Sequence, residues 1–264
     1  SYITHIHDIG PFQANFSRIP GLKWLEKRNA QKAKLILCGA ESVKKEISKY
    51  MEVSDEKIRN ISCAVDEKYK PDKNVGLKAK KELGLKGPVL YYVGRIAFYK
   101  GVEDIIKAYQ AAKKVIPELN LVIGGKPTLK MQDKVARWKH EYPEVKFVGL
   151  VPDEKMVAYY NMADIFVTYS YAAEGWGMTP VEALSCGTPV ICSNMPAYKE
   201  VLQDKAIFVE PQQPDLLAQS FVKYIKSEDL RKQVVEESQE FLKRYSWKEV
   251  GNRVEKVYQE YLDL

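Results

Sequence analysis

The chain has 264 residues and a mass of 30.2 kDa, enough to bury a sizeable core in one large domain or two smaller ones. Hydrophobic residues make up 45% of it and charged residues 29%, which excludes wholesale disorder. The sequence contains no run of about 18 apolar residues and no charged-then-apolar leader, so it predicts neither a transmembrane helix nor a signal peptide. Lys and Arg exceed Asp and Glu by 41 to 35, and the net charge of +6 favours anionic partners.

The distribution of basic residues and of cysteines limits the classes of partner and the cellular location that we expect. Lysines are scattered over predicted helix faces beside Glu and Asp, without a basic stripe interleaved with aromatics, so we expect no nucleic-acid partner. The cysteines form no CxxC pair and have no His at zinc spacing, so no structural metal site is predicted. We expect buried free thiols in a reducing compartment, and the cytoplasm is the predicted location. The residues concerned are Cys38, Cys63, Cys186 and Cys192.

Residues 1–66 alternate short apolar runs with longer amphipathic segments. The predicted elements are the strand YITHI, a helix around 21–33, the strand KLILC, a helix around 42–50 and the strand KIRNIS. A polar, lysine-rich stretch follows from 66 to 87. A domain boundary is predicted there, with residues 67–87 as a hinge or linker.

From residue 88 onward the same alternation continues with strands that are apolar almost throughout. The predicted strands are 88–93, 119–123, 145–149, 165–169, 188–193 and 206–210, and the predicted helices are 102–115, 128–142, 153–163, 179–186, 197–203 and 214–225. Helix 102–115 carries an apolar stripe that includes Tyr109 and Val115. Apolar strands separated by helices are typical of a doubly wound parallel sheet, so the predicted fold class is α/β.

In sheets of this type ligands bind beyond the carboxyl ends of the strands. Gly94 follows the first of these strands and permits a turn, and Arg95 and Lys100 flank the N-terminus of the next helix. Two cations beside free helical N–H groups suit a dianion such as a diphosphate. Surface cations on a glycine-led turn account for the same residues, and both interpretations stay open. Gly124 and Gly125 after the next strand are more typical of a plain tight turn.

The stretch after strand 165–169 places two carboxylates eight positions apart around two glycines. Gly175 and Gly177 permit a strained turn with exposed N–H groups, and the positive end of the next helix points to the same place. Thr179, a proline and Glu182 fit a capping box, with Thr at the N-cap, which gives Glu182 a structural role that needs no ligand. Glu174 lies on the turn, where an exposed loop acid is the simplest interpretation.

Two long motifs now carry a resemblance. VGRIAFYKGVEDIIKAY followed by EGWGMTPVEALSCGTPVICSN resembles the retaining nucleotide-sugar glycosyltransferases of the GT-B family that includes glycogen synthases and bacterial mannosyltransferases, and FVGLV and SWKEVGNRVEKVYQEYL extend the match. The resemblance implies a complete C-terminal Rossmann-like donor domain at 88–235 and helices at 236–264 packing back toward the N-terminal domain. It also implies that residues 1–66 are a partial N-terminal, acceptor-side Rossmann-like domain.

The same resemblance implies roles for individual residues. Arg95 and Lys100 would hold the diphosphate of a UDP- or GDP-linked donor in place of a metal, and Glu174 would contact the donor sugar. Glu182 would bind the ribose, and backbone at 147–151 would meet the base. His7, in the segment ITHIHDIGPF where it precedes Asp8, would lie near the donor sugar. The other implied donor contacts are Gly94, Val148, Gly149, Val151, Gly175, Gly177, Met178 and Thr179; no metal and no further cofactor is implied.

The opening strands of such an N-terminal domain have no counterpart in the sequence. We therefore expect a truncated chain or a partner chain that supplies the rest. A retaining glycosyltransferase acting on a sugar, glycan or lipid-linked acceptor is the leading prediction. A non-catalytic nucleotide-sugar-binding module and a GT-B sugar-nucleotide epimerase stay open. The segment 20–34 has five cations and Trp24, which fits either a solvated helix face or peripheral contact with an anionic inner membrane surface.

Overall fold

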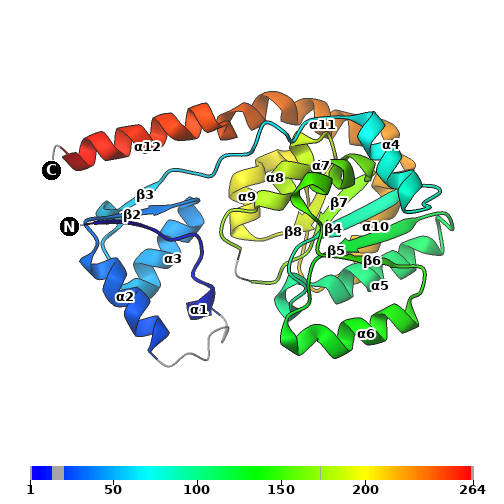
Figure 1. The fold of residues 1–264 in the computed structure, drawn as a ribbon, viewed down its shortest axis with the longest axis horizontal. Coiled ribbons are helices and arrows are strands. Elements are labelled where there is room, and N and C mark those ends of the chain that lie inside the picture. The colour runs from blue at the N-terminus through cyan, green and yellow to red at the C-terminus, as the bar shows by residue number, and fades with distance from the viewer. Residues whose placement is uncertain (1, 14–20, 173, 263–264) are drawn as a thin grey trace.

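The computed structural model describes residues 2–13, 21–172 and 174–262 of the chain. They form two units, each built on a parallel β-sheet, which we call the N-terminal and C-terminal units (Figure 1). Residues 61–72, which we call the hinge segment, lead from one unit to the other, and the last helices run back across both. The predicted α/β class is confirmed.

The N-terminal unit has a three-stranded sheet in the order β1-β2-β3. Its strands are β1 (Ile3–His5), β2 (Leu35–Cys38) and β3 (Ile58–Asn60), and its helices are α1 (Gly10–Gln13), α2 (Leu22–Lys32) and α3 (Glu41–Met51). All four residues of β2 are buried, because helices α2 and α3 cover one face of the sheet and α12 (Trp247–Leu262) reaches the other.

The C-terminal unit has a six-stranded sheet in the order β6-β5-β4-β7-β8-β9. The strands are β4 (Val89–Val93), β5 (Asn120–Gly124), β6 (Lys146–Gly149), β7 (Ile165–Thr168), β8 (Val190–Ser193) and β9 (Ile207–Val209). The helices are α4 (Lys73–Glu82), α5 (Val102–Lys113), α6 (Gln132–Glu141), α7 (Asp153–Met162), α8 (Met178–Ser185), α9 (Pro196–Leu202), α10 (Pro214–Lys226) and α11 (Glu228–Leu242). All pairings within this sheet are parallel.

Helices on both faces explain why the strands are apolar throughout. Along β4, Leu90 and Tyr92 belong to the core beneath α5 and α10, whereas Val89 and Tyr91 belong to the core beneath α7 and α8. Consecutive side chains of a strand point to opposite faces, so each residue of β4 meets one of two helix layers. The second of these cores continues into the N-terminal unit, so the two units share buried contacts.

The order of the strands in the C-terminal sheet determines where a ligand site is expected. The chain first adds β5 and β6 on one side of β4, then returns to add β7, β8 and β9 on the other. The connections that leave the carboxyl ends of β4 and β7 therefore diverge, and a crevice opens between them. Arg95 and Lys100 lie on the first connection and Glu174 on the second.

Three details differ from the sequence-based expectation. The stretch predicted as a linker contains α4, which packs against α7; a Cβ on Gly76 would overlap the carbonyl oxygen of Asn161, so the two helices meet closely. Helix α11 runs across the boundary predicted at 235. Val115 is exposed rather than part of the buried stripe, because α5 ends at Lys113.

Helix α12 crosses from the C-terminal unit onto the N-terminal sheet. Its Val257 packs in a cluster with Leu35, Leu37 and Ile61, and Arg59 on β3 pairs with Glu260 at 3.3 Å. This packing covers the outer face of β2. Over the described part of the chain, none of the helices combines the length and the apolar content that a membrane-spanning segment needs.

Candidate active site

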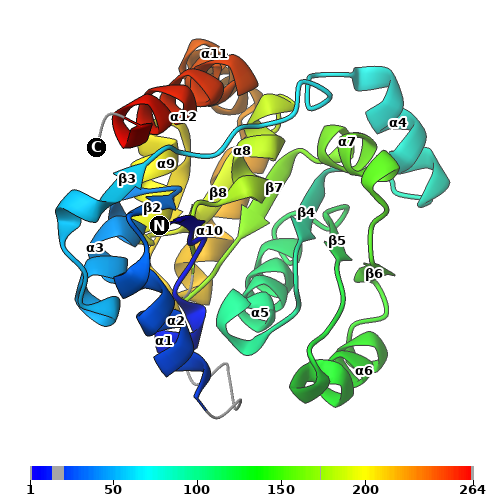
Figure 2. The same ribbon diagram turned by 60° about the vertical axis from the view of Figure 1, so that its left-hand side comes forward.

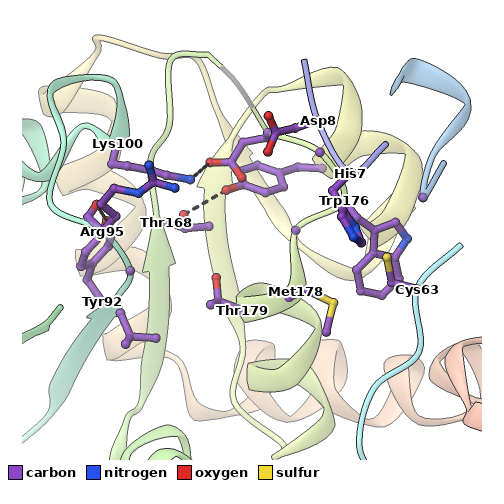
Figure 3. A pocket seen from close by; sticks show the side chains of 17 residues that line it. His7, Asp8, Cys63, Tyr92, Arg95, Lys100, Thr168, Trp176, Met178 and Thr179 are labelled. Carbon is purple, nitrogen blue, oxygen red and sulfur yellow. Dashed lines mark hydrogen bonds and ion pairs between the residues drawn. The ribbon is translucent and has the colours of Figure 1, made fainter. Parts of the chain in front are cut away.

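A cavity of about 280 Å³ lies at the carboxyl ends of β4 and β7, where the two units face one another (Figure 3). Arg95 and Lys100 project from one side, and His7, Asp8 and Trp176 lie on the opposite side. The lining residues that the sequence predicted as site residues are His7, Gly94, Arg95, Lys100, Glu174, Gly175, Gly177, Met178 and Thr179. Residues from three separate parts of the chain thus meet in one place.

The connections after β4 and β7 are held against each other by backbone contacts. The Tyr171 N–H donates to the carbonyl oxygen of Tyr99 at 2.7 Å. A Cβ on Gly101, which has φ +62°, would overlap the carbonyl oxygen of Tyr169. Glycine is therefore required at 101, because any side chain would push the two connections apart. This close approach brings Lys100 next to Glu174.

Lys100 and Glu174 form an ion pair in the cavity wall. The Lys100 ammonium donates to Glu174 Oε1, and the Ser170 hydroxyl donates to the same oxygen. The side chains are 18% and 9% exposed, so the pair is largely removed from water. The expectation of an exposed loop acid at Glu174 is wrong, because the chain folds its carboxylate inward onto a cation. Arg95 is exposed, and its carbonyl oxygen accepts from the Tyr92 hydroxyl at 3.0 Å.

The N-terminus of α8 opens onto the cavity, but the predicted capping box does not form. Helix α8 begins at Met178 after Gly177, which has φ +91°, so Thr179 lies inside the first turn rather than at the N-cap. Pro180 is accommodated there because the first-turn N–H groups need no partner within the helix. The free N–H groups and the helix dipole therefore give this wall of the cavity a positive potential.

Glu182 is also buried, and it is the fifth residue of α8 rather than a residue of its first turn. It is 9% exposed, and the Tyr160 hydroxyl donates to its Oε2 at 2.7 Å. Burial raises the pKa of Glu182, and the hydrogen bond from Tyr160 and the charge of Lys68 offset only part of that effect. Glu182 is not among the residues that line the cavity.

The N-terminal unit contributes the turn after β1. The carboxylate of Asp8 accepts from the Gly10 N–H at 2.8 Å, and the rings of His5 and His7 lie 4.1 Å apart between centroids. Burial, and then the neighbouring His7, lower the pKa of His5. A Cβ on Gly175 would overlap the carbonyl oxygen of His7, so the turns of the two units pack tightly together.

The residues predicted to meet the base lie apart from this cavity. Among the described residues, Val148, Gly149 and Val151 are not part of its wall. Instead the Gly125 N–H donates to the Gly149 carbonyl oxygen at 2.6 Å, and a Cβ on Gly124 would lie 2.6 Å from Val151 Cγ2. These residues pack the ends of β5 and β6 together, and their role toward a donor stays a prediction.

Sequence reasoning missed several lining residues. These are Gly39, Cys63, Tyr92, Val93, Thr168, Trp176 and Tyr198. Thr168 ends β7 and Gly39 follows β2, so the rule that ligands meet strand ends could have indicated both. Tyr198 carried no such signal: it comes from α9, is fully buried, and shares a hydrogen bond of 3.1 Å with Thr168.

The cysteines carry no disulfide, and one of them, Cys63, lines the cavity. All four cysteines are free, and three are buried while Cys63 is half-buried. Burial raises the pKa of the Cys63 thiol to about 11, so it stays protonated beside the cavity. Within 2–13, 21–172 and 174–262, no three His, Cys, Asp or Glu side chains are grouped so that they could hold a metal ion.

Comparison of the sequence with known proteins identifies related glycosyltransferases. The family described as "Glycosyl transferases group 1" matches residues 76–241. O-antigen chain mannosyltransferase B of Escherichia coli is 25% identical over 97% of this chain and 69% of its own length. An uncharacterised glycosyltransferase of Methanocaldococcus jannaschii is 28% identical over 71% of this chain. The chain spans about half the length of the latter, 48% of it.

Solved structures agree on the fold. A crystal structure of Anabaena Alr3699/HepE in complex with UDP and glucose has a TM-score of 0.84 and 18% identity, and covers 99% of this chain and 71% of its own. Sucrose-phosphate synthase from Thermosynechococcus elongatus gives 0.81 and 20%, over 99% of this chain and 68% of its own. The fold is that of GT-B glycosyltransferases. Since the family match covers more than half of the chain, the chain belongs to the group 1 glycosyl transferases.

Proposed function

We propose that the chain transfers a sugar from a nucleoside-diphosphate sugar to an acceptor with retention of the anomeric configuration. One observation carries the proposal: the Arg95 and Lys100 connection, Glu174 and the N-terminus of α8 face a single cavity at the point where the strand order reverses. Two cations and a helix N-terminus suit a diphosphate, and an adjoining carboxylate suits the hydroxyls of a sugar.

These groups fit the charge changes of the reaction. Breaking the bond between the sugar carbon and the phosphate oxygen leaves negative charge on the departing nucleoside diphosphate. Arg95, Lys100 and the α8 N-terminus would stabilise that charge where it develops, without any bound metal being required. The acceptor hydroxyl would attack from the same face, and its proton would pass to the leaving phosphate oxygen. This route needs no enzyme nucleophile.

The relatives suggest a class of donor and acceptor. The structural neighbour from Anabaena binds UDP and glucose, and the Escherichia coli relative is named for transfer of mannose to an O-antigen chain. We propose a UDP- or GDP-linked hexose as donor and a sugar, glycan or lipid-linked molecule as acceptor. His7 and Asp8 would lie near the donor sugar, and Glu182 near the ribose.

A lipid-linked acceptor would be met at a membrane surface from the cytoplasmic side. Helix α2 exposes Trp24 and Leu25 beside the cations Lys23 and Arg28, a combination that suits an anionic inner surface. Charge reversal at Lys23 and Arg28 should weaken sedimentation with anionic vesicles if this contact exists. Equal sedimentation of the variant would contradict it. We also propose a partner chain on the acceptor side.

The proposed function is tested by ligand-induced stabilisation. A melting-temperature panel of UDP, GDP, UDP-glucose, GDP-mannose and UDP-N-acetylglucosamine should show one stabilising pair of nucleotide and nucleotide sugar. Arg95→Ala and Lys100→Met should abolish that shift, whereas Lys232→Met, which removes an exposed lysine far from the cavity, should preserve it. Unchanged nucleotide affinity in both cavity variants would mean that the donor site is wrongly placed.

A turnover assay then distinguishes a transferase, a non-catalytic binding module and an epimerase. Transfer of the sugar to an acceptor, or slow hydrolysis of the donor, supports the transferase. Nucleotide binding without any turnover would favour a non-catalytic binding module. Release of an isomerised sugar without an acceptor would favour an epimerase.

A further inference from the structure

Trp176 lies between the two units, within residues 174–177, which we call the 174–177 loop and which also include Glu174. Trp176 is 5% exposed, and its indole N–H donates to the Ser62 hydroxyl at 3.1 Å. A Cβ on Gly39 would lie 3.3 Å from Trp176 Cδ1, so the ring also meets the N-terminal unit without space to spare. Its indole therefore contacts both the hinge segment and the N-terminal unit.

The hinge segment presents Ser62 in an unusual backbone conformation. Ser62 has φ +66°, in the left-handed region that residues with a side chain seldom adopt. Its N–H donates to Asn60 Oδ1 at 2.9 Å, which supports this conformation locally. Such strain persists only where surrounding contacts hold it. The backbone that carries the Ser62 hydroxyl is thus held by a local hydrogen bond.

The indole of Trp176 also packs against Tyr245. The two rings meet edge to face, 4.9 Å apart between centroids and at 88°. The Tyr245 hydroxyl donates to the Val201 carbonyl oxygen at 2.7 Å, and the Tyr245 carbonyl oxygen accepts from Val65 N–H at 2.9 Å. Tyr245 is therefore bound both to α9 and to the hinge segment, and it gives Trp176 a rigid support.

The 174–177 loop has no room to move toward the N-terminal unit. Gly175 already lies against the His7 carbonyl oxygen, and Gly177 adopts a left-handed conformation that starts α8. Between these two glycines, Trp176 is the long side chain by which the loop contacts the hinge segment. Glu174 is two residues away from it, and its placement depends on this loop.

We propose that Trp176 is a positioning residue: its hydrogen bond to Ser62 sets the place of Glu174 against the donor sugar when the two units are together. The proposal rests on the proposed function of the cavity as a donor site. Arg95 lies on a different connection, after β4, so its contact to the diphosphate does not pass through the 174–177 loop. Lys100 is paired with Glu174, so displacement of Glu174 removes a competitor of the diphosphate rather than a support. Loss of the Trp176 contact therefore weakens recognition of the sugar and spares recognition of the nucleoside diphosphate.

The test compares two ligands in matched variants. Trp176→Phe keeps an aromatic ring on Tyr245 but removes the N–H donor, and Ser62→Ala removes the acceptor. Trp247→Phe, at a site 62% exposed, is the control. The measured quantity is the ratio of the Kd of the nucleotide sugar to the Kd of the matching nucleoside diphosphate, by calorimetry, with the pair chosen from UDP and UDP-glucose or GDP and GDP-mannose.

In both variants the affinity for the nucleotide sugar should fall about fivefold, in line with the loss of one hydrogen bond. The affinity for the nucleoside diphosphate should not fall, because a displaced Glu174 leaves Lys100 available to it. The double variant should be no weaker than either single variant, because both remove the same contact. Equal weakening of the two ligands, additive effects or no effect would overturn the proposal.

A second measurement keeps this proposal separable from the proposed function. Hydrogen exchange at the backbone of residues 174–177 should accelerate in Trp176→Phe and Ser62→Ala, while exchange at residues 94–100 stays unchanged. If the unaltered chain binds neither ligand, the proposed function is wrong, and exchange still decides whether Trp176 anchors the loop. Unchanged exchange at 174–177 would show that it does not.

Discussion

At the scale of single residues, the ion pair of Lys100 and Glu174 gives the cavity an internal anion. The Glu174 carboxylate pairs with the Lys100 ammonium. A diphosphate that approaches Lys100 must therefore compete with a carboxylate that is covalently part of the site. Because the pair is largely buried, the competition is little screened by salt.

Glu174→Gln should consequently raise the affinity for a nucleoside diphosphate, by about threefold to tenfold, because Lys100 loses its internal partner. The same change should lower transfer of the sugar, since Gln cannot supply the negative charge beside the reacting carbon. Calorimetry with UDP or GDP and a transfer assay measure the two effects. Glu228→Gln, which breaks an exposed pair with Lys232, is the control and should change neither. A weaker nucleotide affinity in Glu174→Gln would show that the pair positions Lys100 instead of competing for it.

Glu182 makes stability depend on pH in a definite direction. Burial holds the pKa of Glu182 above its ordinary value, so the folded chain binds this proton more tightly than the unfolded chain. The stabilisation is full below the unfolded pKa and is lost as the pH rises through the folded one. Glu182→Gln does not ionise, so its stability relative to the unaltered chain should increase between about pH 4 and pH 7. Urea unfolding across this range measures it, and parallel profiles for the two proteins would contradict the argument.

At the scale of elements, helix α3 of the N-terminal unit is capped by a residue of the C-terminal unit. The residue before α3 is Ala40, whose side chain offers no acceptor, and the N–H groups of Glu41 and Ser42 donate to the Glu200 carboxylate at 2.5 and 2.8 Å. Glu200 lies on α9, beside α3 across the boundary (Figure 2). A carboxylate at a helix N-terminus also interacts favourably with the helix dipole.

Glu200→Ala should lower the free energy of unfolding by about 1–2 kcal/mol, because two first-turn N–H groups lose their acceptor. Glu200→Gln keeps an acceptor oxygen and loses the charge, so it should fall in between. Chemical denaturation measures both, with Glu240→Ala, an exposed carboxylate on α11, as the control. If Ala and Gln are equally harmless, the capping contact makes no net contribution to stability.

The same elements show what the sequence could and could not predict. Apolar runs indicated β4, β7 and β8 closely, because strands covered on both faces can hold little else. The sequence predicts a linker where α4 lies, since three of the four lysines of α4 are exposed and its buried residues are small ones, Gly76 and Ala79. Small residues give no hydrophobic pattern in the sequence, so their packing role is evident only from the contact between α4 and α7.

The residues that line the cavity could be predicted from the sequence where they follow a strand, and could not be predicted where their placement depends on a distant partner. Arg95, Lys100 and Glu174 could be found from strand ends. The capping box with Thr179 at the N-cap was wrong because the N-cap is Gly177, in a left-handed conformation, two residues earlier than the pattern suggests. The role of Trp176 could not be found locally, because Ser62 and Tyr245 are brought to it by the whole fold.

At the scale of the whole molecule, helix α12 near the C-terminus packs on the N-terminal unit. Along β2, Ile36 and Cys38 face the core shared by the two units, whereas Leu35 and Leu37 face α12. The N-terminal sheet is therefore covered on one face by α2 and α3 and on the other by the last helix of the chain. Without α12 the outer face of β2 would be apolar and open to water.

Val257→Asp should loosen the N-terminal unit, because it places a carboxylate among the buried apolar side chains of Leu35, Leu37 and Ile61. A cost of about 2–4 kcal/mol is expected for such a buried charge. Hydrogen exchange should accelerate in β2 and change little in β4, whose cores do not include the α12 cluster. Tyr258→Asp puts the same charge on an exposed position of α12 and should leave exchange in β2 unaltered. Equal acceleration in β2 and β4 would mean that the two units open together, and that the shared core around Trp176 and Tyr245 couples them more strongly than α12 does.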